Sequence, residues 1–312
     1  MENRIVCRVL TGPTASGKSE LAFRIAREYG WEIICMDSMQ VYRGMDIGTA
    51  KPTPEERAAV IHHLLDICDP REAFSVSSYV EEAVQTVQKC ASRGKNVLFV
   101  GGTGLYLESM MRGMSLGNMP ADEQLRSELK VLAAGPDGKR LLDERLRETD
   151  PDTADKLPLN DLRRRIRAIE VSEKTGIPFS KQSCCVSGSP FRWIVAGTCM
   201  ERDHLYGKIN LRAEHMINRG LAGEVERLIS EGVPEDAQSM QAIGYKEMIP
   251  YIRGKYTKEK ALYEICIRTR HYAKRQITYL KRIEETQFVN TESEDAYEHL
   301  TKIFSEGGDL QK

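Results

Sequence analysis

The stretch of this chain that most limits its fold is GPTASGKS at residues 12–19, which fits the phosphate-loop pattern G-x-x-x-x-G-K-[ST] at every position. A largely apolar run at 5–10 precedes it, and an amphipathic stretch opened by Gly17 follows it. The motif therefore stands between a predicted strand and a predicted helix. In that context successive backbone N–H groups form a nest for a polyphosphate. The alternative is a chance match in a glycine-containing turn.

Further short apolar runs predict strands at 32–36, 97–101 and 191–197, and helical spacing at 76–94 separates two of them. Strands that alternate with helices form a parallel sheet covered on both faces. The sequence therefore predicts an α/β fold, a P-loop NTPase-like parallel sheet flanked by helices.

A second region has a different character. Residues 115–188 contain no strand-like run, and five prolines punctuate short charged helices. We predict an all-helical insertion domain at 115–190. The catalytic core then comprises residues 1–114 and 191–312, with long helices in its C-terminal part.

Composition excludes some classes of protein. The 312 residues are 41% hydrophobic and 29% charged, as in a globular chain, and a net charge of -1 provides no global basic field. No apolar run approaches membrane-spanning length, and the phosphate loop begins too near Met1 for a cleavable signal, so we expect no membrane association and a cytoplasmic location.

The eight cysteines lack C-x-x-C spacing and a secretory context, which argues against a zinc ribbon and a disulfide framework. We expect mostly buried thiols at Cys7, Cys35, Cys68, Cys90, Cys184, Cys185, Cys199 and Cys266.

Acidic residues near the loop bear on the type of phosphate. An NTP-hydrolysing protein usually ends a further strand with an aspartate that holds magnesium, but the run at 97–101 leads into glycines around Thr103. The acid follows the strand at 32–36 instead, where Asp37 emerges at the carboxyl edge of the sheet. It is a candidate metal ligand or base, or merely the start of a turn. Thr103 is a candidate for contact with an oxygen of the leaving group. The alternative is a simple loop residue.

Two basic stretches are candidates for RNA binding. RRRIR at 163–167 lies in the predicted insertion, and RTRHYAKRQITYLKR at 268–282 contains aromatic residues and no acid. Cations interleaved with aromatic rings suit phosphate contact and base stacking. The alternative for each is a solvated helix face.

Taken together, several motifs resemble the tRNA dimethylallyltransferases, also called tRNA isopentenyltransferases. They occur in order over nearly the whole chain as GPTASGKS, DSMQVYRGMDIGTAKP, HHLLDI, VGGTGLYLESMMRG, NDLRRRIRAIEV, QAIGYKE and RTRHYAKRQITYLKR. The resemblance implies transfer of a dimethylallyl group from dimethylallyl diphosphate to N6 of the adenosine on the 3′ side of the anticodon. The tRNAs concerned read codons that start with U. The phosphate loop would then bind a diphosphate leaving group rather than ATP.

The same resemblance implies site residues. Asp37, Thr103 and Lys18 would be catalytic, and Mg²⁺ would be the cofactor, held near Ser19. Diphosphate binding would fall to Gly12, Pro13, Thr14, Ala15, Ser16, Gly17, Lys18, Ser19 and Arg212. Contacts with the tRNA anticodon arm would come from Asp37, Ser38, Met39, Gln40, Arg126, Arg163, Arg164, Arg165, Ile166, Arg167, Gln241, Ala242, Ile243, Gly244, Tyr245, Lys246, Arg270, Lys274 and Arg275. Without the resemblance, Arg212 would be interpreted as a solvated residue of an amphipathic helix.

Two alternative functions share part of this pattern. A P-loop small-molecule or nucleoside kinase would share the loop, Asp37 and the α/β core, but it would need no large helical insertion. A non-catalytic RNA-binding module would share the basic stretches, but it would not need a phosphate loop. The eukaryotic members of the family carry a C-terminal zinc finger, but no Cys/His metal spacing follows Arg282, so the resemblance is to the bacterial members. Separately, we expect a monomer.

Overall fold

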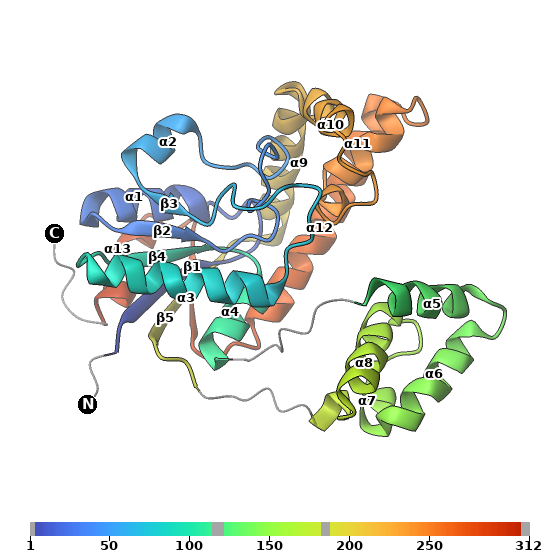
Figure 1. Cartoon of the computed structure of the whole chain (residues 1–312). Helices are drawn as coiled ribbons and strands as arrows, with labels where there is room; N and C mark the ends of the chain where they lie inside the picture. The colour runs from blue at the N-terminus through green and yellow to red at the C-terminus, as the bar shows by residue number, and fades with distance from the viewer. Residues whose placement is uncertain (1–3, 114–121, 182–187, 307–312) are drawn as a thin grey trace. The chain divides into compact units, whose positions relative to one another are not determined.

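The fold is described from a computed structural model of the chain, for residues 4–113, 122–181 and 188–306 (Figure 1). The chain forms two compact units. One comprises residues 1–112 and 188–312, and the other comprises residues 113–187.

The first unit is built on a six-stranded sheet in the order β3-β2-β4-β1-β5-β6, in which every neighbouring pair is parallel. The strands are β1 (Val6–Thr11), β2 (Glu32–Cys35), β3 (His62–His63), β4 (Val97–Gly101), β5 (Arg192–Cys199) and β6 (Thr286–Asn290). The predicted parallel sheet flanked by helices is confirmed. The sequence did not predict β3, which has two residues, or β6, in which only Val289 is buried.

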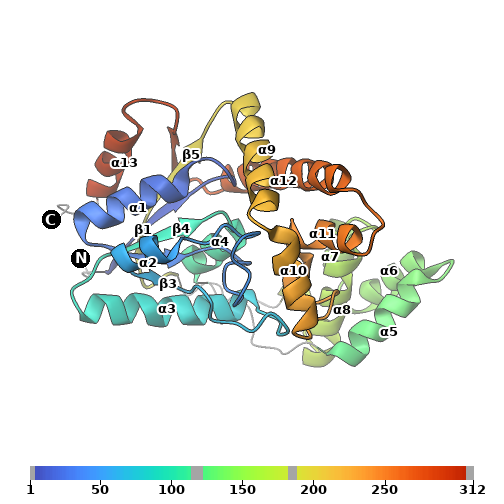
Figure 2. The same ribbon diagram turned by 90° about the horizontal axis from the view of Figure 1, so that it is seen from above.

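Helices cover both faces of this sheet, as Figure 2 shows. On one face α3 (Val76–Ser92) and α4 (Gly104–Arg112) pack on the strands through a core that includes Tyr79, Val9 and Phe99. On the other face α1 (Lys18–Tyr29) and α13 (Ala296–Ser305) pack against Leu10 and Leu98. Alternate residues of β1 and β4 thus supply both cores, as expected for strands buried on both sides.

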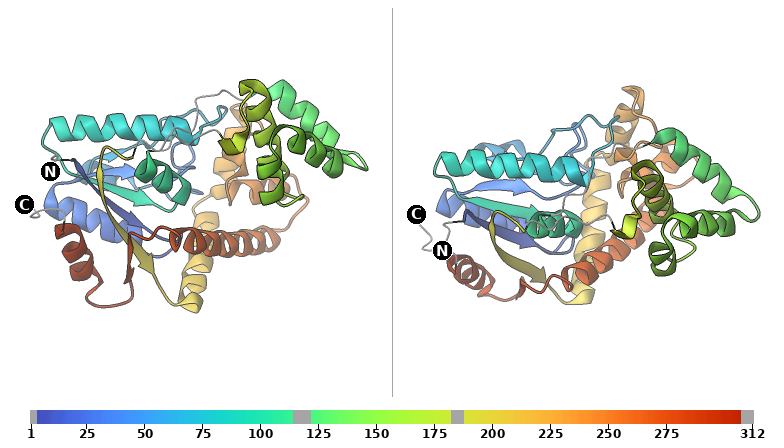
Figure 3. Two further views of the ribbon diagram at one scale, coloured as in Figure 1. Left: turned by 90° about the horizontal axis from the view of Figure 1, so that it is seen from below. Right: turned by 60° about the horizontal axis from the view of Figure 1, so that its bottom comes forward.

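Beyond the carboxyl edge of the sheet the same unit continues as helices α9 (Arg202–Asn218), α10 (Leu221–Ser230), α11 (Tyr245–Ile252) and α12 (Lys258–Leu280). The long α12 lies beside α9, where Ala273 and Leu205 share a small apolar core (Figure 3). A larger core joins α10, α11 and α12 to the loop after β2, in which Val41, Tyr42 and Met45 are fully buried. The short α2 (Pro54–Ala59) begins at a capping box formed by Thr53 and Glu56.

The second unit is a small helical domain. Its described part contains α5 (Glu123–Ala134), α6 (Gly138–Thr149), α7 (Pro151–Lys156) and α8 (Leu162–Thr175), packed around Leu129, Leu142, Leu146 and Ile169. No strand occurs within residues 122–181. The helical insertion predicted at 115–190 corresponds to this unit.

The structure also bears on the expectations for the cysteines and for membrane-spanning helices. The six cysteines within the described residues are free thiols, of which Cys199 is half-buried and the others are buried. Cys184 and Cys185 lie outside the described residues. No helix in the described part of the chain is both long and apolar enough to cross a bilayer.

Candidate active site

The phosphate loop joins β1 to α1, and contacts with β5 fix its shape. Gly12 has φ +151°, and a Cβ added there would lie 1.8 Å from Thr198 Oγ1, so the position requires glycine. Thr198 Oγ1 also lies 2.6 Å from Ser16 Oγ in a buried hydrogen bond. Gly17 caps α1 in the left-handed conformation. The Ser16 side chain therefore anchors the loop.

A pocket opens beside this loop at the carboxyl edge of the sheet, where the segments after parallel strands converge. The predicted residues that line it are Thr14, Lys18, Ser19, Asp37, Gln40 and Arg212. The structure thus brings together residues that are separated by almost 200 positions.

Positive charge dominates the polar side of this pocket. Burial, reinforced by the nearby Arg212 and opposed by Asp37, lowers the pKa of Lys18 to about 8. Burial also lowers the pKa of Arg212, and Asp37 again opposes the shift. Lys51 and Glu56 also line the pocket, so its cations outnumber its carboxylates by one, which favours binding of an additional anion.

Asp37 serves the turn that follows β2 and also faces the pocket. Its Oδ1 accepts hydrogen bonds from the N–H of Met39 at 2.8 Å and of Gln40 at 3.3 Å. Among the described residues, Oδ2 has no hydrogen-bond partner. The turn-forming role considered from sequence is therefore present, and it leaves one carboxylate oxygen available to a ligand.

Thr103 is tied to the same turn. Its Oγ1 accepts a hydrogen bond from Ser38 N–H at 3.2 Å, and its N–H donates to Met36 O at 3.3 Å. The close approach of the loop after β4 to the Met36 backbone requires Gly101, because a Cβ there would lie 2.0 Å from Met36 O. Burial, reinforced by the Asp37 charge, raises the pKa of Tyr272, whose side chain is hydrogen-bonded to Thr103. Thr103 is thus placed beside Asp37 by hydrogen bonds on both sides.

Sequence reasoning missed Gln276, a buried residue of α12 that links two loops of the site. Its Oε1 accepts the N–H of Thr14 at 2.8 Å, and its Nε2 donates to Gly102 O at 3.0 Å. A Cβ on Gly102 would lie 2.0 Å from Nε2. The Thr14 N–H is therefore engaged by protein rather than free for phosphate. The available signal was that Gln276 is the only amide side chain in the basic stretch 268–282.

The loop at 37–52 is held by a second buried residue that sequence reasoning missed, Glu224 of α10. Its carboxylate accepts the N–H groups of Asp46, Ile47 and Gly48 at 2.9–3.3 Å. The Tyr245 hydroxyl donates to the same carboxylate, and a Cβ on Gly48 would lie 2.3 Å from the Tyr245 ring. Glu224 and Tyr245 thus anchor the loop at 46–48, and the contact with the Tyr245 ring requires glycine at position 48.

This anchoring corrects part of the predicted RNA-contact set at 241–246. Tyr245 is fully buried and Ala242 is 5% exposed, so their side chains belong to the core. Gln241 and Lys246 are exposed and remain available, while Ile243 is half-buried. Gly244 has φ +101° at the start of α11, which explains the glycine by conformation.

The basic run of the helical unit needs a similar correction. Arg165 is 1% exposed; it pairs with Asp143 and donates to the carbonyls of Ala154, Leu157 and Pro158. Its role is structural, because each side of the guanidinium is satisfied within the domain. The next residue, Ile166, is also in the core.

The other arginines of this unit differ in their availability. Arg163 and Arg164 are exposed, and Arg163 has no ion-pair partner among the described residues. Arg126 and Arg167 both pair with the buried Glu170. The unit therefore presents two solvent-facing arginines in the predicted run, with two more held at a buried carboxylate.

On α12 the predicted contacts also separate into two kinds. Lys274 and Arg275 are exposed, and Arg275 lies 5.7 Å from the centre of the Tyr272 ring. Arg270 is half-buried; it donates to Asn210 Oδ1 at 2.8 Å and lies over the Tyr206 ring. Lys274 and Arg275 are thus the cations of this set that face solvent.

Comparisons with known proteins identify the relatives of this chain. The family model described as IPP transferase matches residues 40–283. A tRNA dimethylallyltransferase of Thermotoga maritima is 43% identical over 295 residues, which is 95% of each chain. A homologue of the same name from Shouchella clausii is 42% identical over 95% of this chain and 93% of its own.

Solved structures are similar along the whole chain. The tRNA isopentenylpyrophosphate transferase of Bacillus halodurans is 36% identical with a TM-score of 0.71, and the match covers 99% of both chains. A eukaryotic dimethylallyltransferase, described as acting on tRNA, is 25% identical with a TM-score of 0.79, over 96% of this chain and 78% of its own.

Proposed function

This chain belongs to the IPP transferase family and is a tRNA-modifying prenyltransferase, and from that premise we propose the reaction in detail. It transfers a dimethylallyl group from dimethylallyl diphosphate to N6 of the adenosine 3′ to the anticodon, in tRNAs that read codons starting with U. The observation that carries the proposal is the phosphate loop with Lys18 and Arg212 in one pocket with Asp37. The direct test is whether label from the donor appears on that adenosine and whether diphosphate is released.

The cationic side of the pocket binds the diphosphate. As the bond between the allylic carbon and the bridging oxygen breaks, negative charge accumulates on the leaving group. We propose that Lys18, Arg212 and the phosphate-loop N–H groups other than that of Thr14 stabilise that charge, with little reorganisation during the reaction. We propose that Thr103 donates a hydrogen bond to the bridging oxygen. Gln276 holds the Thr14 segment in position.

Asp37 is the general base in this proposal. The exocyclic amine of adenine is a weak nucleophile because its lone pair is delocalised into the ring, so removal of its proton assists formation of the C–N bond. The Oδ2 atom would accept the proton while Oδ1 keeps the turn at 37–40 in place. The carboxylate thereby starts the reaction in a fixed orientation.

Mg²⁺ fits the donor set of this pocket. The hydroxyl of Ser19 lines it, and a hard oxygen ligand of this kind, together with oxygens of the diphosphate, suits this ion. Ser19 would hold the ion near the phosphate loop, and the ion would neutralise part of the charge on the diphosphate.

The apolar side of the pocket suits the dimethylallyl group. Phe23, Ile33, Leu65 and Val100 line it, on the same cavity as the cations. An apolar wall beside an anion site matches a donor with a hydrocarbon chain at one end and a diphosphate at the other.

The tRNA anticodon arm is the proposed macromolecular substrate, and the reacting base must leave its stack to be modified. The solvent-facing cations Arg163, Arg164, Lys246, Lys274 and Arg275 are proposed to contact RNA. The aromatic Tyr272 lines the pocket itself, in position for stacking. We further propose that the enzyme works as a monomer in the cytoplasm, where its tRNA substrate occurs.

Binding of the donor is expected to weaken above pH 8. The pKa of Lys18 is about 8 in the free protein, so the charged form that attracts diphosphate is lost as the pH rises through that value. A bound anion keeps the proton on Lys18, and the dissociation constant should therefore rise by up to about tenfold per pH unit. Calorimetry with dimethylallyl diphosphate and no tRNA measures it. Lys18→Met should bind weakly at every pH; a flat wild-type profile between about pH 7 and 10 would contradict the assignment.

Neighbouring arginines of the helical unit should behave differently when replaced. Arg163→Ala and Arg164→Ala should each weaken tRNA binding and reduce the salt slope of log K by about 1. Arg165→Ala should instead lower the free energy of unfolding by about 3–5 kcal/mol, because it leaves three buried carbonyls without a donor and Asp143 paired with Arg147 alone. Filter binding at several salt concentrations and urea unfolding measure the two effects. Arg140 is an exposed arginine of α6, and Arg140→Ala is the control. Unchanged salt slopes in Arg163→Ala and Arg164→Ala would exclude contact of these arginines with RNA.

Gln276 is expected to support turnover without touching the reacting atoms. Gln276→Leu keeps the volume but leaves Thr14 N–H and Gly102 O unpaired, so kcat should fall about tenfold to a hundredfold through misplacement of the two loops. Gln276→Glu retains the acceptor for Thr14 but turns a carboxylate oxygen toward Gly102 O, so it should not restore kcat. Steady-state kinetics with thermal unfolding measures both variants, with the exposed Gln287→Leu as control. Normal kcat in Gln276→Leu would show that the bridge has no positioning role.

A further inference from the structure

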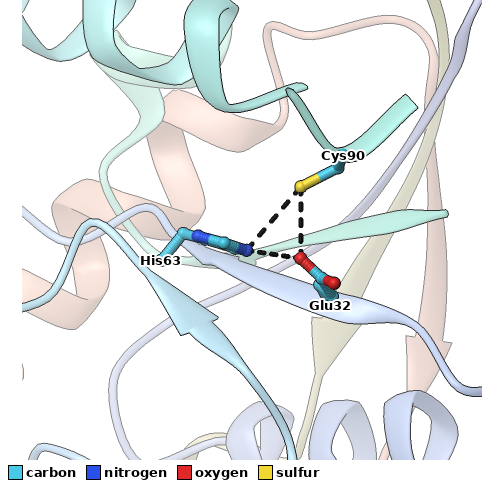
Figure 4. Close-up of side chains that lie close together, drawn as sticks. All are labelled: Glu32, His63 and Cys90. Carbon is cyan, nitrogen blue, oxygen red and sulfur yellow. Dashed lines mark hydrogen bonds and ion pairs between the residues drawn. The ribbon is translucent and has the colours of Figure 1, made fainter. Parts of the chain in front are cut away.

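Three side chains that commonly bind metals meet at the amino end of β2, and none of them lines the active-site pocket (Figure 4). Glu32 is the first residue of β2, His63 is the last of β3, and Cys90 lies near the end of α3. Glu32 Oε2 is 2.6 Å from His63 Nε2 and 3.3 Å from Cys90 Sγ. The remaining distance, from Cys90 Sγ to His63 Nε2, is 3.6 Å.

We propose that Glu32, His63 and Cys90 form a binding site for a divalent transition-metal cation of the Zn²⁺ class. Carboxylate, imidazole and thiolate are the ligand types that this cation prefers. With ligands at about 2.0–2.3 Å in tetrahedral geometry, neighbouring ligand atoms lie about 3.3–3.6 Å apart. Both distances to Cys90 Sγ already have that spacing. The hydrogen bond between Glu32 and His63 would open by less than about 1 Å to admit the ion.

Burial of the three residues suits a metal site with one open position. Cys90 is fully buried and Glu32 is 3% exposed, while the His63 side chain is 25% exposed. The fourth coordination position is therefore within reach of water on the His63 side. Glu32 Oε1 is buried and has no hydrogen-bond partner among the described residues. This oxygen is therefore free to accept a hydrogen bond or to bind a cation. The transfer reaction uses none of these groups.

Arg93 occupies the exposed side of the cluster. Its Nη2 lies 2.7 Å from Glu32 Oε2 and 3.5 Å from Cys90 Sγ, and its side chain is 50% exposed. Burial alone would raise the pKa of Glu32, but hydrogen bonds from His63, Cys90 and Arg93 hold it below its usual value. The guanidinium thus neutralises the carboxylate without a metal, and a bound cation would displace it into solvent. Arg93 therefore competes with the metal.

Protons must leave when the metal binds. Burial, reinforced by Glu32, raises the pKa of the Cys90 thiol, so the sulfur carries a proton before binding. On binding, the S–H proton is released to solvent and the sulfur forms the bond to the metal as thiolate. His63 binds through unprotonated Nε2. No oxidation or reduction takes place.

The test is a Co²⁺ titration of the full chain, followed by thiolate-to-cobalt charge-transfer absorption and reversed by Zn²⁺. Cys184→Ser, Cys185→Ser and Cys199→Ser in the background remove thiols that do not belong to the cluster. We expect one equivalent of Co²⁺ to bind. Cys90→Ser should abolish the charge-transfer band, and His63→Gln should weaken binding by at least about tenfold. Arg93→Gln should tighten binding, which a merely structural salt bridge does not predict.

Zn²⁺ should also raise the melting temperature of the background protein, and a chelator should reverse the effect. Absence of a charge-transfer band in the folded protein, or a band that persists in Cys90→Ser, would overturn the proposal. If Cys90→Ser does not fold, His63→Gln decides, because its side chain is partly exposed; unchanged affinity in that variant would exclude the site. Weaker binding in Arg93→Gln would also count against it.

Discussion

Asp37→Asn is expected to lower kcat for prenyl transfer by roughly 10²–10⁴-fold while tRNA affinity changes little. The amide keeps the shape of the side chain, and its oxygen still accepts the N–H groups of Met39 and Gln40, so the turn is preserved. What is lost is the oxygen that accepts a proton from the adenine amine. Single-turnover rates with saturating donor and tRNA measure the chemical step, and filter binding measures affinity.

Asp203→Asn is the matched control, since Asp203 is an exposed residue in the first turn of α9. Its kcat should equal that of the unaltered protein. A normal single-turnover rate in Asp37→Asn would exclude Asp37 as the base. A parallel loss of tRNA affinity would instead indicate that Asp37 acts in substrate binding.

Arg212→Gln is expected to reduce kcat by about 10²–10³-fold and to weaken donor binding. Arg212 lies in the pocket with Lys18, and its charge disfavours the charged form of Lys18 until an anion binds in the pocket. The interaction grows as the diphosphate departs, so its loss should affect the transition state more than the ground state. Kinetics over a range of donor concentrations separates kcat from KM.

Arg219→Gln provides the control for this variant, because Arg219 directly follows the same helix and is exposed. It should leave both kinetic constants unchanged. If Arg212→Gln raised KM alone, the residue would contribute uniform binding and no specific stabilisation of the leaving group.

The sequence predicts the fold well where structure is encoded locally. The strands near 5–10, 32–36, 97–101 and 191–197 are predictable because each is a short apolar run buried on both faces. β6 could not be predicted in this way, because its pattern is mostly exposed and its pairing with β5 is decided by tertiary contact. The family prediction is confirmed by similarity along the whole chain.

The site is predictable only in part, because a motif identifies residues but does not say which of their side chains are buried in the core. Arg165 lies in the same basic run as Arg163 and Arg164, yet its side chain is bound inside the helical domain to Asp143 and to Ala154 O. Gln276 and Glu224 stabilise loops that are far away in sequence. The Glu32, His63 and Cys90 cluster has no motif because its members come from three elements. Such long-range pairings are set by tertiary packing and not by local spacing.

The most direct test of the central claim, that the phosphate loop holds the diphosphate of an isoprenoid donor, is a double-label transfer assay. Purified protein and Mg²⁺ are incubated with unmodified tRNA that reads a U-starting codon, together with labelled dimethylallyl diphosphate or, separately, labelled ATP. The same tRNA with guanosine 3′ to the anticodon is the control. The account predicts isoprenoid label on the adenosine, none on the guanosine and no phosphate transfer from ATP. Movement of ATP phosphate to an acceptor, without prenylation of the adenosine, would contradict it.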